Sequence, residues 1–173
     1  AAIERNKISV NTTYECPGYY MLGQARFGCA HVHGKENLYQ AIAHSCNVYF
    51  FRIGQLLGPS LIGEYAKAFG LGRLTGIDLP FETRGKIVMP NQKKEGWFTG
   101  NTLNLSIGQG DTLATPLQVT VMMAAVANNG IILKPHVIKA LASGTLPVLD
   151  LSKRPKIRLR DTAWGEIKKG MRM

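Results

Sequence analysis

The chain has 173 residues, of which 45% are hydrophobic, and 21 Lys and Arg against 11 Asp and Glu give it a net charge of +10. This length suits one domain or a large part of one, with enough apolar side chains for a packed core. No run of about 18 apolar residues occurs, so we expect no segment to span a membrane. Residues 1–5 lack the order of a signal peptide, so any export signal is expected outside the chain.

The positive charge suggests nucleic acid as a first candidate partner. However, the densest basic stretch, residues 153–160, alternates with apolar residues as a strand does and forms no basic arm. We interpret the charge as a solvated basic surface and expect no nucleic-acid partner. Attraction to an anionic substrate or to a membrane surface remains an alternative.

Turn residues and short apolar stretches predict a hairpin near the N-terminus, with residues 19–22 in one arm and 26–28 in the other. Asn37 is the predicted N-cap of a first helix. A second apolar helix begins near Asn47 and stops at Gly58, followed by Pro59.

A third helix is expected over residues 61–69, because its apolar residues follow the three- and four-residue spacing of a helix. Residues 70–90 form a connector rich in Gly and Pro, and residues 91–98 could hold a short helix. Thr115 followed by Pro116 is a strong helix start, and this helix is expected to run to Asn128.

Short strands are expected at residues 131–133, 136–141 and 156–159, and a last helix capped by Asp161 is expected to reach Met173. These elements predict an α-rich α+β fold. They divide the chain into an irregular hairpin region (1–34), a helical subdomain (35–130) and a region of strands with a final helix (131–173).

Seven short segments, in their order along the chain, resemble the transpeptidase domain of class B penicillin-binding proteins. They lie at residues 41–51, 69–72, 75–80, 104–110, 115–118, 127–130 and 134–136. A further segment at residues 16–20 is similar to the elongation-type branch of the family. The resemblance implies the helical part of the penicillin-binding and β-lactamase-like fold.

This family uses a Ser-x-x-Lys motif with the nucleophile, a Ser-x-Asn motif and a Lys-Thr-Gly motif. The sequence contains the second of these, as Ser45 and Asn47, and contains neither of the others. The nucleophile is expected roughly 50 residues before Ser45. We therefore expect truncation at both ends, and we expect the 173 residues to be inactive by themselves.

The resemblance implies serine acyl transfer at a D-Ala–D-Ala bond, with no cofactor for catalysis. Ser45 would relay a proton to the leaving amine, and Asn47 would orient the substrate. The plainer interpretation makes Ser45 a helix N-cap and Asn47 a solvated polar residue. His31, His44 and His136 are interpreted as surface or capping residues, and residues 108–110 as a structural turn.

Cys16, Cys29, His33 and Cys46 follow the pattern C-x12-C-x3-H-x12-C, and four Cys and His ligands are typical of structural zinc. Some elongation-type relatives are similar in placing metal-ligand residue types at these positions. Cys46 is expected to be a thiolate because it lies at a helix start. The alternatives are a Cys16–Cys29 disulfide, three unrelated thiols, or His31 as ligand in place of His33.

The resemblance implies a penicillin-sensitive D,D-transpeptidase that cross-links peptidoglycan stem peptides. Expected partners are stem peptides, β-lactams, a glycosyltransferase and other elongation-complex proteins. The expected location is the periplasmic face of the bacterial inner membrane, with the membrane anchor outside this chain. Alternatives are a β-lactam-sensing or non-catalytic relative, because fold alone does not fix activity, and a zinc-stabilised binding module.

Overall fold

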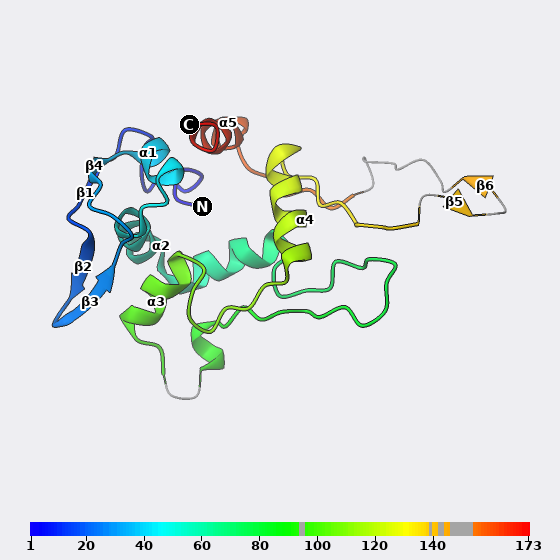
Figure 1. Cartoon of the computed structure of the whole chain (residues 1–173), viewed down its shortest axis with the longest axis horizontal. Coiled ribbons are helices and arrows are strands. Elements are labelled where there is room, and N and C mark those ends of the chain that lie inside the picture. The colour runs from blue at the N-terminus through cyan, green and yellow to red at the C-terminus, as the bar shows by residue number, and fades with distance from the viewer. Residues whose placement is uncertain (94–95, 139, 142–143, 146–153) are drawn as a thin grey trace. The chain divides into compact units, whose positions relative to one another are not determined.

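The computed structural model describes residues 1–93, 96–138, 140–141, 144–145 and 154–173 (Figure 1). Helices dominate the described residues, and the strands form short antiparallel pairs, which confirms the predicted α-rich α+β class. The chain folds into two compact units. One comprises Ala1–Tyr65, Val88–Thr112 and Leu159–Met173, and the other comprises Ala66–Ile87 and Leu113–Arg158.

The predicted division into three regions, with boundaries after residues 34 and 130, stays a prediction. Among the helices of the described residues, none is both long and apolar enough to cross a membrane.

Two pairs of short strands form the N-terminal part of the first unit. Strand β2 (Tyr19–Leu22) pairs with β3 (Ala25–Gly28), which confirms the predicted hairpin. Strand β1 (Tyr14–Cys16) pairs with β4 (Gly34–Glu36) and places Cys16 opposite Gly34. This second pair was not predicted, because strands of three residues show no usable alternation of polar and apolar residues.

Helix α1 (Leu38–Ala43) begins at the predicted cap. The Asn37 side chain accepts from the Gln40 backbone N–H at 3.1 Å, and the Gln40 side chain accepts from the Asn37 N–H at 3.0 Å. This reciprocal pair satisfies two backbone donors that the helix itself leaves free.

Helix α2 (Asn47–Ala68) contains a kink at Gly58, whose φ of 74° and ψ of 162° are not helical. The two predicted helices are therefore present, and they meet at the kink without an intervening loop. The hairpin packs on α2 through Phe51, whose ring lies 5.8 Å from Phe27 and 6.1 Å from Tyr20 between centroids. Phe51 and its neighbour Tyr49 are buried in the core of the unit.

Helix α3 (Thr99–Ser106) was not predicted, because Thr, Gly and Asn are weak helix formers. The short helix expected at residues 91–98 is instead a 3₁₀ turn, η1 (Pro90–Gln92), and α3 starts after Phe98. Burial of Leu103 and Leu105 indicates that tertiary packing outweighs the poor local propensity of α3.

Helix α5 (Asp161–Gly170) packs against α1, with Lys169 over the Tyr39 ring and a hydrogen bond from the Tyr39 hydroxyl to Glu166. The prediction for this helix was wrong at both ends. Arg160 is the N-cap, Asp161 is the first helical residue, and the helix ends at Gly170 before Met173.

In the second unit, α4 (Pro116–Ala127) begins as predicted at Thr115, whose hydroxyl accepts from the Gln118 N–H at 3.1 Å. The buried Gln118 side chain also donates to the carbonyl oxygens of Arg73 and Arg84, at 2.5 and 2.6 Å. These bonds fix the connector on the N-terminal turn of α4.

The strands expected at 131–133 and 156–159 were largely wrong, since they form a single bridge between Ile131 and Lys156. Residues 136–138 are not a strand, and residue 139 of the expected strand lies outside the described residues. Strand β5 (Ala140–Leu141) pairs with β6 (Gly144–Thr145). Such short segments are apolar enough to suggest strands but offer too few residues for a longer ladder.

The close approach of α2 and α3 gives a stability test. A Cβ added at Gly54 would collide with the Ser106 Cβ and lie 2.8 Å from its Oγ, so Gly54→Ala should destabilise the intact protein by about 1–3 kcal/mol. Gly165→Ala is the matched control, because Gly165 lies in α5 with open space around it. It should stabilise by about 0.5–1 kcal/mol. Urea unfolding measures both, and equal effects of the two variants would contradict the packing interpretation.

Candidate metal centre beside a Ser-x-Asn turn

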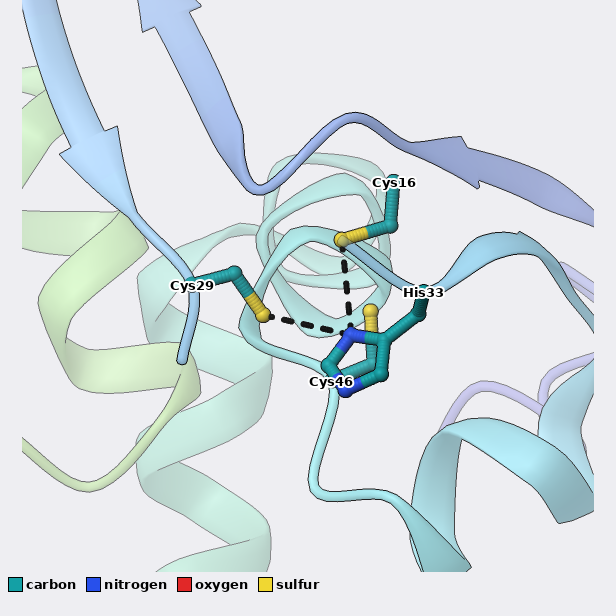
Figure 2. Close-up of side chains that lie close together, drawn as sticks. All are labelled: Cys16, Cys29, His33 and Cys46. Carbon is teal, nitrogen blue, oxygen red and sulfur yellow. Dashed lines mark hydrogen bonds between the residues drawn. The ribbon is translucent and has the colours of Figure 1, made fainter. Parts of the chain in front are cut away.

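Four side chains from separate segments point toward one another (Figure 2). Cys16 ends β1, Cys29 follows β3, His33 precedes β4 and Cys46 directly precedes α2. Their potential ligand atoms all lie within 4.8 Å of one another. The fold therefore brings together all four residues that the sequence predicted as metal ligands.

The distances suit a small tetrahedral ion. The His33 Nδ1 lies 3.5 Å from the Cys16 Sγ and 3.5 Å from the Cys29 Sγ. Bonds of ~2.3 Å to sulfur and ~2.1 Å to nitrogen at tetrahedral angles place the ligand atoms roughly 3.5–3.8 Å apart. Cys16 and Cys46 are buried, whereas Cys29 and His33 are partly exposed. Three thiols and one imidazole are also the donor types that zinc prefers.

The rival arrangements do not match this geometry. All three cysteines are free, so the expected alternative of a Cys16–Cys29 disulfide is not formed. His31 is not in the four-residue cluster: its carbonyl oxygen accepts from the Cys16 thiol at 3.6 Å, and its ring meets His33 edge-on. The third alternative, three unrelated thiols, does not predict that all three cysteines lie beside one imidazole.

The cysteines differ in acidity in the absence of an ion. Burial opposes ionisation of Cys29, but backbone N–H groups of Val48, Asn47 and His31 donate to its sulfur and lower its pKa below the usual value. Burial raises the pKa of Cys46 to about 12. In metal-free protein the start of α2 therefore does not make Cys46 a thiolate, because burial outweighs the hydrogen bond that the Tyr49 backbone N–H donates to its sulfur.

Ser45 lies in the turn between α1 and α2. It is exposed and has a φ of 55°, which is the left-handed region that residues other than glycine rarely adopt. Two backbone hydrogen bonds hold the turn, from the Ser45 N–H to the Ile42 carbonyl at 3.3 Å and from the Cys46 N–H to the Ala41 carbonyl at 3.0 Å. The Ser45 side chain is thus presented at the surface from a fixed backbone.

Asn47 is the first residue of α2 and connects it to β3. Its backbone N–H donates to the Cys29 Sγ at 3.2 Å, and its side-chain Nδ2 donates to the Gly28 carbonyl oxygen at 3.2 Å. Asn47 therefore joins the Ser-x-Asn segment to the metal cluster through both its backbone and its side chain.

Sequence reasoning missed one residue beside the cluster, the buried Glu36 at the end of β4. Its Oε1 lies 2.9 Å from the Nδ1 of His44, and the His44 ring stacks on His33. No sequence pattern signals this contact, because a glutamate in a three-residue polar strand resembles any surface residue.

Comparison with known proteins identifies the family of the chain. The penicillin binding protein transpeptidase domain family matches residues 1–173, so the chain belongs to this family. A Haemophilus influenzae relative named peptidoglycan D,D-transpeptidase MrdA is 35% identical over 181 residues. This alignment covers 99% of the chain and 28% of the relative, so the chain spans less than a third of that protein's length.

Solved structures support the finer assignment. Pseudomonas aeruginosa PBP2 in complex with WCK 5153 superposes with a TM-score of 0.86 at 29% identity, covering 98% of this chain and 40% of that one. Helicobacter pylori PBP2 in its complex with MreC gives 0.77 at 29% identity, over 95% of this chain and 31% of that one. The predicted resemblance to penicillin-binding protein 2, the elongation-type branch, is confirmed.

The unequal acidity of the cysteines gives a prediction for metal-free protein. At neutral pH, iodoacetamide should modify Cys29 before Cys46, because Cys29 has the lowered pKa and greater exposure. As pH rises, labelling of Cys29 should reach its plateau at a lower pH than that of an ordinary cysteine. Peptide mapping by mass spectrometry over a pH series measures both, and labelling of Cys46 as fast as Cys29 would contradict the prediction.

Proposed function

We propose that the protein containing this chain is a peptidoglycan D,D-transpeptidase that cross-links stem peptides by serine acyl transfer and is acylated by β-lactams. The observation that carries this proposal is the family match over all 173 residues, together with the activity in the name of the H. influenzae relative. The 173 residues contain neither Ser-x-x-Lys nor Lys-Thr-Gly, so the proposal assigns the nucleophile to another part of the protein, and this chain alone is expected to be inactive.

In this reaction a serine attacks the carbonyl of the D-Ala–D-Ala bond, the terminal D-Ala leaves, and a second stem peptide takes the acyl group. The leaving amine needs a proton, and we assign its relay to the Ser45 hydroxyl. The exposed side chain and the fixed left-handed turn of Ser45 support this role. Asn47 would orient the substrate through its side-chain amide. When substrate binds, this amide would give up its hydrogen bond to the Gly28 carbonyl oxygen, or keep it and donate its second hydrogen to the substrate.

We further propose that Cys16, Cys29, His33 and Cys46 hold a structural zinc ion. The ion would supply a cross-link that joins the ends of β1 and β3 and the loop before β4 to Cys46, the residue before α2. One of the four ligands, Cys46, lies between Ser45 and Asn47 in sequence. The bound ion would therefore keep the Ser-x-Asn turn in place without touching substrate.

The proposed setting is the periplasmic face of the bacterial inner membrane, where a glycosyltransferase and other elongation-complex proteins would be partners. The similarity to H. pylori PBP2, whose structure was solved as a complex with MreC, supports such an assembly.

Ser45→Ala in the intact protein should slow acylation by a fluorescent penicillin roughly 10²–10⁴-fold, the usual contribution of a positioned proton-transfer group. Ser60→Ala, which removes an exposed hydroxyl from α2, is the matched control and should react at the wild-type rate. Stopped-flow fluorescence measures both rates. Wild-type acylation by Ser45→Ala would return Ser45 to a purely structural role.

The intact protein should bind about one zinc ion at this centre, and chelation should lower its melting temperature. An ion that binds the folded state alone stabilises it by about 2.7 kcal/mol when free zinc is 100 times the dissociation constant. Cys46→Ser should lose the ion, melt at a lower temperature than the wild type and no longer respond to the chelator. Elemental analysis with calorimetry provides the measurement. A wild-type protein that contains no zinc after refolding with excess zinc would remove the proposed centre.

A further inference from the structure

Glu36 presents a buried carboxyl group directly beside the candidate metal centre. The residue is 2% exposed, and its Oε1 lies 2.9 Å from the His44 Nδ1. Its other oxygen, Oε2, is buried without a hydrogen-bond partner. Burying such an oxygen costs free energy, and the bond to His44 offsets part of that cost. The carboxyl group therefore fixes the orientation of the His44 ring while this bond is made.

The His44 ring in turn stacks on the ring of His33. The two imidazole rings are nearly parallel, with an interplanar angle of 9° and centroids 5.8 Å apart. His31 meets the His33 ring at 85°, with centroids 5.9 Å apart. The His33 ring is thereby held in the orientation in which its Nδ1 faces the Cys16 and Cys29 sulfur atoms (Figure 2).

We propose that Glu36 and His44 are positioning residues of the metal centre: Glu36 fixes the His44 ring, and His44 keeps His33 in its ligating orientation. This inference rests on the proposed zinc centre and adds two residues that do not touch the ion. Glu36 is not a fifth ligand, because the group of mutually close ligand atoms comprises Cys16, Cys29, His33 and Cys46.

The same pair borders the Ser-x-Asn segment. The backbone N–H of His44 closes the C-terminal end of α1, and the following residue is the left-handed Ser45. Fixing the His44 side chain thus orders the entry to the Ser45 turn, while Cys46 orders its exit at the cluster. The contact between the buried Glu36 and the exposed His44 would in this way link strand β4, the metal ligand His33 and the turn.

The test measures zinc affinity of the intact protein by competition with a chromophoric chelator. Glu36→Gln replaces the carboxyl group by an amide of the same shape whose oxygen is a weaker hydrogen-bond acceptor for the His44 ring, and His44→Ala removes the stacked ring. Each should weaken zinc binding about 10–100-fold, the usual effect of losing a group that orients a ligand. Glu15→Gln is the matched control, because Glu15 is an exposed carboxylate next to Cys16. Its zinc affinity should be unchanged.

A double variant separates positioning from general destabilisation. If Glu36 acts through His44, Glu36→Gln combined with His44→Ala should bind zinc as weakly as His44→Ala alone. Cobalt(II) substituted for zinc provides a second readout, since its visible absorption depends on ligand geometry. The Glu36→Gln spectrum should differ from that of the wild type, and the Glu15→Gln spectrum should not. If His44→Ala does not fold, His44→Gln takes its place in the cycle.

Three results would overturn the inference, and they are distinguishable. If the wild-type protein binds no zinc, both the proposed zinc centre and the positioning role of Glu36 and His44 are wrong. If Glu36→Gln and His44→Ala bind zinc with wild-type affinity and leave the cobalt spectrum unchanged, the positioning role is wrong and the zinc centre still stands. A further loss of affinity caused by Glu36→Gln in the His44→Ala background shows that Glu36 acts by another route.

Discussion

The convergence of three thiols and one imidazole at the start of α2 is the constraint on which the site depends. The four residues come from the ends of β1 and β3, from the loop before β4 and from the residue before α2. The two strand pairs of this region are very short, and isolated pairs of this kind are marginal by themselves. A cross-link at the cluster would therefore stabilise the segments that surround Ser45 and Asn47.

The surroundings of the cluster affect the pKa values of Cys29 and Cys46 in opposite directions. Zinc binds thiolates, yet burial raises the pKa of Cys46 to about 12 in the absence of metal. Burial opposes ionisation of Cys29, but three backbone N–H groups lower its pKa below the usual value, so this thiol ionises more readily than Cys46. The positive charge of the ion would then stabilise the buried Cys46 thiolate, which the protein alone does not.

The three consecutive residues Ser45, Cys46 and Asn47 have different surroundings. Cys46 points into the buried cluster, whereas Ser45 is exposed and Asn47 binds the end of β3. Ser45, between two anchored neighbours, is held in a left-handed conformation that residues other than glycine rarely adopt. In the proposed function, this short segment would hold both a metal ligand and the residues assigned to acyl transfer.

The sequence by itself determined the features whose physical causes are local or whose ligand spacing is distinctive. The caps at Asn37 and Thr115, the hairpin at residues 19–28 and the break at Gly58 follow from hydrogen-bonding side chains and permitted backbone angles. The set of metal-ligand candidates followed from residue type and family resemblance. Tertiary structure decided the rest: α3 forms despite poor propensity because Leu103 and Leu105 are buried, and the β1–β4 pair brings Cys16 near His33. It also decided which cysteine is acidic and placed Glu36 against His44, because burial and hydrogen-bond partners depend on segments that are distant in sequence.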